Sequence, residues 1–203
     1  MLDHLVYATP DLDQTVVDLA GRGITLSLGG PHPGLGTCNY LAALGDRSFL
    51  EVVGPDREQP DPVTARPFGI DDLTEARLMT WAIQVPDLDE ALDRARAGEH
   101  EPGEVMAMSR RRPDDVLLSW RLAFPSDNQG GLVPFVIAWG DTPHPSLSAA
   151  TGTRLVRLRG EHPDPGRLGV VFAALDTELD VTEAAEPGLV AELTTGSGTV
   201  VLR

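Results

Sequence analysis

The sequence predicts an α+β fold in which paired βαβββ modules form a curved, half-open mixed β-sheet barrel, followed by a C-terminal partial third module. A short strand, the tetrapeptide Pro-Asp-Leu-Asp and a helical pattern occur twice in this order, and each copy continues into three further strand signals. The chain has 203 residues, 41% of them hydrophobic, so it can bury a core. Because a single βαβββ sheet leaves one curved apolar face uncovered, two such units can enclose a shared cleft.

The first module is expected at residues 1–56. Its opening strand is the apolar run HLVYA, and an apolar stripe at helical spacing follows in DLDQTVVDLA. Pro10 suits the first helical position, with Thr9 as the N-cap. Three strands are predicted in ITLSLGG, CNYLAAL and SFLEVVGP, and a turn at residues 45–47 joins the last two.

Residues 57–76 are rich in Pro and Asp, and we expect them to connect the first module to a second one at residues 77–142. The second module repeats the pattern with the strand WAIQV, a helical stripe in DLDEALDRA, and strands in GEVMAMSRR, VLLSWRLAF and VPFVIAWG. Residues 143–203 begin the pattern again, with a strand in RLVRLRG and a helix in GRLGVVFAAL. This last segment is expected to form a partial βαβ-type module.

The composition narrows the range of partners. Acidic residues outnumber basic ones 31 to 16 and give a formal charge of -15, which repels nucleic acid and anionic membrane surfaces. No apolar run is long enough to span a membrane, and the N-terminus lacks the basic start of a signal peptide, so a cytoplasmic protein is expected. The expected partner is a small molecule in the cleft, and a homodimer stays open as the assembly.

Missing residue types and motifs narrow the chemistry. The chain contains no Lys, so lysine Schiff-base chemistry is excluded. The single cysteine, Cys38, rules out an internal disulfide and a multi-cysteine metal site. The patterns GxGxxG, GxxxxGK, HExxH and GxSxG do not occur in the expected contexts, so no nucleotide cofactor is expected.

Two polar residues lie within otherwise apolar strands, His4 in MLDHLVYA and Glu51 in SFLEVVGP. Because strand residues alternate between faces, His4 is expected to face away from Leu5. Glu51 is expected to face away from its neighbours Leu50 and Val52, which suit the helix layer. A carboxylate in so apolar a run is costly to bury, so a metal, a hydrogen-bond network or water in an open cleft must satisfy it.

These features resemble the vicinal oxygen chelate superfamily, and within it the glyoxalase-like proteins of the glyoxalase, bleomycin resistance and dioxygenase type. The segment GGPHPGLGTCNYLAALGDRSFLEVVG, with His32, Asn39 and Glu51, and the segment LVPFVIAWGDTPHPS carry the resemblance. The resemblance implies a metal ligand from the first strand, here His4, and a Glu from the last strand, here Glu51. An imidazole and a carboxylate together suit one divalent metal ion such as Zn, Fe, Mn or Ni.

The second module lacks both residue types. When the two Pro-Asp-Leu-Asp segments are aligned, His4 corresponds to Thr80, and matching the terminal strands places Glu51 on Ala138. Catalytic zinc normally has three protein ligands, so a metal here needs a third ligand, for which His32 is the best candidate, or completion by the substrate. A metal-free acid–base or binding pair formed by His4 and Glu51 stays open beside the metal site.

Four residues are predicted to bind substrate. His32 lies in a Gly-rich loop and is expected at the rim of the cleft, while Asn39 offers an amide for a hydrogen bond. The run SRRRPDD supplies Arg111, on the opposite strand face from its two neighbours, and a guanidinium suits a carboxylate or phosphate. Trp139 offers an aromatic wall and an indole N–H. The three remaining histidines are assigned no role.

By this resemblance, the chain is expected to be a glyoxalase-like enzyme of isomerase, lyase or dioxygenase type that acts on a small oxygen-bearing molecule. Glu51 would be a ligand or general base, and His4 a ligand or the partner of that base. The alternative is a non-catalytic protein of the same fold that binds or sequesters a small molecule, which the apolar second module favours. The sequence leaves the choice between enzyme and binding protein open.

Overall fold

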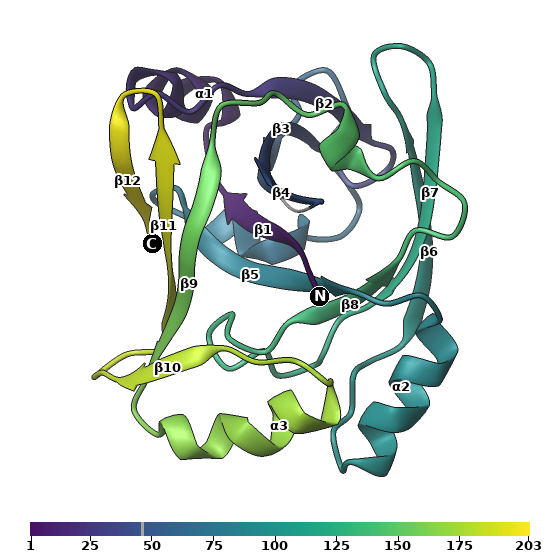
Figure 1. Cartoon of the computed structure of the whole chain (residues 1–203). Coiled ribbons are helices and arrows are strands. Elements are labelled where there is room, and N and C mark those ends of the chain that lie inside the picture. Colours follow the sequence, from purple (N-terminus) through teal and green to yellow (C-terminus); the bar gives the residue numbers. More distant parts are fainter. Residues whose placement is uncertain (46) are drawn as a thin grey trace.

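The computed structural model describes residues 1–45 and 47–203. Strands of the large sheet follow the order β2-β3-β4-β1-β5-β8-β7-β6, and a smaller sheet has the order β10-β9-β11-β12 (Figure 1). The chain is therefore a mixed α+β protein built around one curved sheet, as the sequence predicts. Asp46, in the predicted turn at residues 45–47, lies outside the described residues.

The large sheet contains the same series of elements twice. The first series is β1 (Leu2–Ala8), α1 (Leu12–Gly21), β2 (Ser27–His32), β3 (Thr37–Gly45) and β4 (Ser48–Pro55). The second series is β5 (Arg77–Gln84), α2 (Leu88–Ala97), β6 (Val105–Arg111), β7 (Leu117–Ala123) and β8 (Phe135–Ala138). Between them lies a short 3-10 helix, η1 (Pro67–Asp72), and a second one, η2 (Pro145–Leu147), follows β8.

The smaller sheet comes from the C-terminal part of the chain. Its elements are β9 (Arg154–His162), the 3-10 helix η3 (Pro165–Arg167), α3 (Leu168–Ala174), β10 (Asp180–Glu183), β11 (Gly188–Thr195) and β12 (Gly198–Leu202). Strand β9 pairs parallel with β10 and antiparallel with β11. This sheet packs beside β1 and β5 (Figure 1), so it covers the outer face of the large sheet.

The strand pairing closes the large sheet nearly into a barrel. Strand β1 pairs parallel with β4 and antiparallel with β5, which joins the two halves at the centre. At the two edges, Arg110 of β6 donates a hydrogen bond to the carbonyl of Gly29 in β2. A Cβ atom at Gly30 would lie 2.5 Å from the carbonyl oxygen of Arg111, and φ is +130° there, so this close approach needs a glycine. We call this contact between β2 and β6 the seam.

The first aspartate of each Pro-Asp-Leu-Asp segment is the N-cap of a helix. Helix α1 begins at Leu12, and Asp11 is its N-cap, accepting a hydrogen bond at 3.1 Å from the backbone N–H three residues on. Asp87 caps α2 in the same way. The predictions of Thr9 as the N-cap and Pro10 as the first helical residue are wrong, because both precede the cap, and the Thr9 hydroxyl lies 2.7 Å from that of Thr15. In the described part of the chain, no helix combines the length and apolar character needed to cross a membrane.

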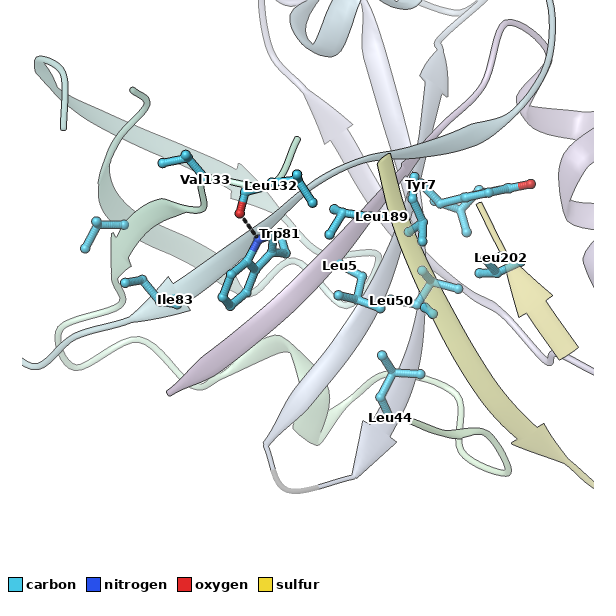
Figure 2. Close-up of a cluster of buried hydrophobic side chains, with 14 of the residues drawn as sticks. Leu5, Tyr7, Leu44, Leu50, Trp81, Ile83, Leu132, Val133, Leu189 and Leu202 are labelled. Carbon is cyan, nitrogen blue, oxygen red and sulfur yellow. Dashed lines mark hydrogen bonds between the residues drawn. The ribbon is translucent and has the colours of Figure 1, made fainter. Parts of the chain in front are cut away.

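Each face of the curved sheet has its own apolar core. Leu5, Leu50 and Trp81 point outward and pack with Leu189 of the smaller sheet (Figure 2), and the Trp81 indole donates to the carbonyl of Leu132 at 2.8 Å. The inner core is formed by residues that alternate with these along the strands, among them Val6, Leu41, Val53, Leu122, Phe135 and Ile137. Alternation therefore sends every second residue of β1 and β4 toward the hollow of the barrel.

Candidate active site

A cavity of about 800 Å³ occupies the hollow inside the curved sheet. Its wall is mostly aromatic and aliphatic, with Phe49, Phe68, Met108, Trp120, Leu122, Phe124, Phe135, Ile137 and Trp139. A few polar side chains reach it, namely His4, His32, Asn39, Glu51, Arg110 and Asn128. A largely apolar pocket with a few converging polar groups is typical of a small-molecule site.

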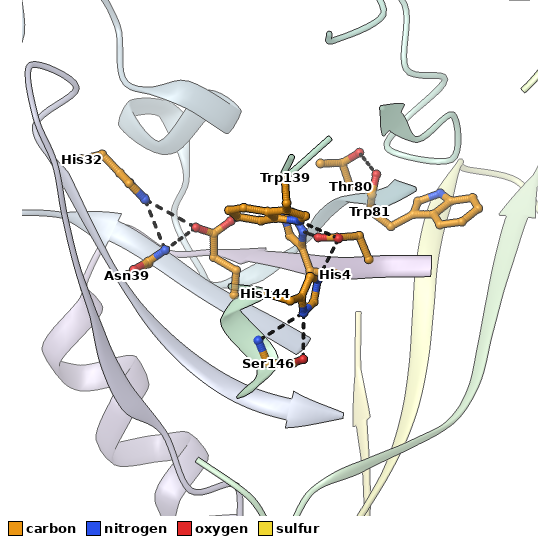
Figure 3. A network of polar contacts seen from close by, with 10 residues as sticks. His4, His32, Asn39, Thr80, Trp81, Trp139, His144 and Ser146 are labelled. Atoms are coloured by element: carbon orange, nitrogen blue, oxygen red, sulfur yellow. Dashed lines mark hydrogen bonds and ion pairs between the residues drawn. The ribbon is translucent and has the colours of Figure 1, made fainter. Parts of the chain in front are cut away.

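His4 enters the cavity from β1 and is held from behind by a buried carboxylate. Its Nδ1 lies 2.5 Å from Asp3 Oδ1, while Asp3 Oδ2 accepts from His144 Nε2 and from Trp139 Nε1, both at 2.9 Å (Figure 3). Burial opposes ionisation of Asp3, but the hydrogen bonds with His144 and His4 outweigh it and hold the pKa of this carboxyl well below its ordinary value. Asp3 can then only accept, so neutral His4 carries its hydrogen on Nδ1 and keeps a free lone pair on Nε2.

Glu51 enters the same cavity from β4, on the face opposite to Leu50 and Val52 as alternation predicts. Its Oε1 accepts a hydrogen bond from Asn39 Nδ2 at 2.5 Å. Its Oε2 lies 3.7 Å from His4 Nε2. The structure therefore brings the two predicted residues together, with a carboxylate oxygen and an imidazole lone pair facing each other.

His32 and Asn39 form a second layer behind Glu51. His32 stands at the end of β2, and its Nε2 accepts a hydrogen bond from Asn39 Nδ2 at 3.2 Å, so its Nδ1–H donates to the hydroxyl of Thr37 at 2.9 Å. Burial lowers the pKa of His32, although the charge of Glu51 opposes this effect. The lowered pKa favours the neutral ring. Both hydrogens of the Asn39 amide are thus used, one on His32 and one on Glu51, and the carboxylate is fixed in place.

The cavity contains an arginine, but it is the neighbour of the predicted one. Arg111 is exposed and donates to Asp115, at 2.9 Å to its carbonyl and 3.2 Å to its carboxylate, so the prediction of Arg111 as the cleft residue is wrong. Arg110 is buried and lines the cavity. Alternation on β6 separates the two residues correctly, but the strand register sends the even-numbered one inward.

Trp139 lines the cavity beside Trp120, with ring centroids 5.3 Å apart. Its indole N–H, which could bind a ligand according to the sequence, is instead used by Asp3 at 2.9 Å. The ring therefore serves as a wall and also holds the carboxylate that orients His4.

Sequence reasoning missed two residues of this site, Asp3 and His144. Strict alternation would turn Asp3 away from His4, but the pairing of β1 with β5 is irregular between Leu2 and His4. Such a bulge re-aims a side chain, and it lets Asp3 reach its neighbour. His144 is 141 residues away from Asp3 in the chain, and no local pattern announces their contact.

The connecting segment contributes to the site as well. Ala65, Pro67 and Phe68 line the cavity. Arg66 fixes the segment, because it donates to the carbonyl of Gly36 at 3.0 Å and pairs with Asp71 at 2.7 Å. Residues 57–76, expected only to join two modules, therefore also cover the cavity.

The aligned counterpart of Glu51 in the second module is Phe135. Val6 pairs with Glu51 across β1 and β4, and Ala82, which corresponds to Val6, pairs with Phe135 across β5 and β8. The expectation of Ala138 at this position is wrong by three residues. An aromatic ring thus occupies the position of an acid, and the second module supplies a wall where the first supplies a charge.

The residues present do not fit a metal ion held by the protein. His4 Nε2 and Glu51 Oε2 are two donors, and the predicted third ligand, His32, spends its Nε2 lone pair on Asn39. Among the residues that the structure describes, no three His, Cys, Asp or Glu side chains gather in a group that could hold a metal. Catalytic zinc sites normally use three protein ligands, and this site offers two.

The glyoxalase-like domain family matches residues 2–175 of this chain. No curated protein sequence matches it. Among solved structures, a hypothetical protein from Staphylococcus aureus has a TM-score of 0.67 at 16% identity, with 98% of this chain and 83% of that one covered. The Mn(II)-bound glyoxalase from Novosphingobium aromaticivorans has a TM-score of 0.52 at 8% identity, with 98% and 80% covered.

A methylmalonyl-CoA epimerase from Mycobacterium tuberculosis has a TM-score of 0.47 at 21% identity, with 70% of this chain and 88% of that one covered. At these identities, the Staphylococcus and Novosphingobium structures show a shared fold. The family match covers most of the 203 residues, including both modules of the large sheet. The chain therefore belongs to the glyoxalase-like domain family and has the vicinal oxygen chelate fold that its repeated modules predict.

Proposed function

We propose that this glyoxalase-like protein is an enzyme that moves a proton on a small oxygen-bearing molecule, in an isomerisation or lyase step. One observation carries the proposal: His4 Nε2 and Glu51 Oε2 face each other at 3.7 Å in a mostly apolar cavity. Neither atom accepts a hydrogen bond from the described residues, so both are available to a ligand.

Glu51 is the base that acts on carbon in this proposal. Its Oε1 is fixed by Asn39 at 2.5 Å, which leaves Oε2 to take a proton from a carbon next to a carbonyl group. Glu51 then returns the proton to the neighbouring carbon in an isomerisation, or gives it to the group that the enolate expels in a lyase step. The aromatic walls keep out water that would otherwise solvate the carboxylate.

His4 acts on oxygen. Asp3 fixes the hydrogen of His4 on Nδ1, so Nε2 accepts the proton of the substrate hydroxyl and passes it to the neighbouring carbonyl oxygen, while Glu51 moves the proton on carbon. Proton removal at one atom and return at another leaves the substrate's oxidation state unchanged. Dioxygenation is not part of the proposal, because the site offers two of the three protein ligands that non-haem iron oxygenases use.

Deuterium exchange tests this proposal directly. The protein is incubated in D2O with a panel of 2-hydroxy ketones, 2-hydroxy aldehydes and 2-oxo acids, and loss of the proton signal next to the carbonyl is followed by NMR. We expect exchange on at least one member, and a rate lower by roughly 100- to 10,000-fold in Glu51→Gln, the magnitude of a lost general base.

The matched control is Glu183→Gln, which removes an exposed carboxylate from β10, far along the chain from the site. Its exchange rate should equal that of the unchanged protein. Equal rates in Glu51→Gln and Glu183→Gln would contradict the proposal, as would a complete lack of exchange across the panel.

A non-catalytic binding role is the second candidate, and the second module favours it. Its inner face presents Trp120, Phe135 and Ile137, which bind an apolar ligand but transfer no proton. If panel members raise the melting temperature of the protein but none of them exchanges deuterium, a binding role is supported over catalysis.

A further inference from the structure

Arg110 is the only arginine among the described residues whose side chain is buried. It extends from β6 into the wall of the cavity, and the structure gives its guanidinium one protein acceptor, the carbonyl of Gly29. A guanidinium has five N–H donors, so four of them have no acceptor in the described part of the chain.

The charge of Arg110 is also uncompensated. No carboxylate of the described residues lies within ion-pair distance of it, in a protein where Asp and Glu outnumber Arg 31 to 16 and most other arginines have such a partner. Burial accordingly lowers the pKa of Arg110, although Glu51 opposes this effect from across the cavity. A buried cation without a partner is costly, and an anionic ligand would offset that cost.

We infer that the cavity binds a monocarboxylate with an apolar or aromatic body, whose carboxylate lies on Arg110 and whose reactive end lies toward His4 and Glu51. A planar carboxylate accepts two parallel hydrogen bonds from a guanidinium fork, which uses donors that are otherwise idle. The inference rests on the proposed function only in treating this ligand as a substrate.

The charge balance of the cavity selects a single negative charge. Among the described residues, Arg110 is the one arginine that lines the cavity, and Glu51 is a lining anion. Beside Glu51, a phosphate dianion would bring two negative charges against the single positive charge of Arg110, whereas a carboxylate brings one. The remaining wall, with rings such as Phe124, Trp120 and Phe135, fits an apolar body, and about 800 Å³ holds a ligand of two fused rings.

Isothermal titration calorimetry with three matched probes tests the inference. The probes are 1-naphthaleneacetate, its neutral amide 1-naphthaleneacetamide, and 1-naphthyl phosphate. We expect the unchanged protein to bind the acetate about 10- to 100-fold tighter than the amide, as charge-assisted hydrogen bonds imply. In Arg110→Met, the acetate should bind no tighter than the amide, while the affinity for the amide stays unchanged and reports an intact cavity.

Arg111→Met is the matched control, because it removes the neighbouring exposed arginine and leaves the cavity wall intact. It should keep the preference for the acetate. Because Arg110 also holds the seam, Arg110→Lys, which keeps the positive charge, is measured in parallel. The comparison of acetate with amide in the unchanged protein needs no variant. Glu51→Gln should bind the acetate at least as tightly as the unchanged protein, although it is expected to lose exchange.

Equal binding of acetate and amide by the unchanged protein would overturn the inference, as would an acetate preference that survives in Arg110→Met. Tighter binding of the phosphate than of the acetate would overturn the assignment to a monocarboxylate. An acetate preference that depends on Arg110 would uphold the binding site even if no panel member exchanges deuterium, so failure here and failure of the proposed function are separate results.

Discussion

The two modules of the large sheet share one backbone plan but differ in what they present to the cavity. The first module supplies His4 and Glu51, supported by Asp3, His32 and Asn39. The second module presents Trp120, Phe135 and Ile137 from its central strands, and only Arg110, on its edge strand, carries a charge into the cavity.

This difference shows how one duplicated scaffold can divide the requirements of a site. Polar groups buried for chemistry cost stability, whereas apolar walls contribute it. Placing most of each kind of residue in its own module lets one module stabilise the barrel while the other carries the buried polar groups. Stability measurements on matched variants test this division between the modules.

The strongest contrast is between the paired positions Phe135 and Glu51. Phe135 is 2% exposed and packs against Phe124, with ring centroids 4.4 Å apart and the rings tilted by 41°, so Phe135→Ala should lower the free energy of unfolding by about 3 kcal/mol. Glu51→Gln keeps an acceptor for Asn39 and removes a buried charge, so it should change that free energy by less than about 1 kcal/mol.

Urea denaturation of both variants provides the measurement. If Glu51→Gln destabilises the protein as much as Phe135→Ala does, the carboxylate is a structural element and the division between modules does not hold.

The next contrast lies within the first module, between Asp3, the buried aspartate that positions His4, and an exposed aspartate. Asp3→Asn places an amide NH2 where one of three donors now points, from His4, His144 or Trp139. We expect a loss of about 2 kcal/mol in the free energy of unfolding, the cost of a buried unsatisfied donor. Asp13→Asn, on the exposed face of α1, should lower this free energy by less than about 1 kcal/mol, because only its interaction with the helix N-terminus is lost. Equal stability of the two variants would show that the Asp3 hydrogen bonds do not stabilise the fold.

The smallest effect concerns pH and His32. Because its pKa in the folded protein is lowered from 6.5, the unfolded chain takes up a proton below pH 6.5 that the folded protein does not. The contribution of neutral His32 to the free energy of unfolding is therefore fully present above pH 6.5 and is lost as the pH falls below this value. Unfolding followed between pH 7 and pH 5 should show a steeper fall for the unchanged protein than for His32→Gln. Parallel curves would assign the pH dependence to other groups.

Residues whose placement depends on local periodicity could be predicted from the sequence. Alternation along two strands sends His4 and Glu51 to the inner face, and the repeated helix start identifies the paired modules. The pairing of β1 with β4 then brings these two strands side by side. For this reason the centre of the candidate site follows from two short segments.

Residues whose placement depends on strand register, a bulge or a distant contact could not be predicted. A choice between Arg110 and Arg111 needs the register of β6, which alternation alone leaves undetermined. Asp3 needs an irregular pairing that no residue type indicates, and His144 contacts it across 141 residues of chain. The counterpart of Glu51 shifts from Ala138 to Phe135 because ladder pairing, and not sequence similarity, defines equivalent positions.

The seam links ligand binding in the cavity to the stability of the two edge strands of the large sheet. Arg110 ties β6 to Gly29 of β2, and the same guanidinium lines the cavity. If a carboxylate binds more tightly when the edges β2 and β6 are joined, its binding must by thermodynamic reciprocity also favour the joined edges. Amide hydrogens of β2 and β6 would exchange with solvent more slowly in the loaded protein, so the two strands farthest apart in the sheet order would report filling of its centre together.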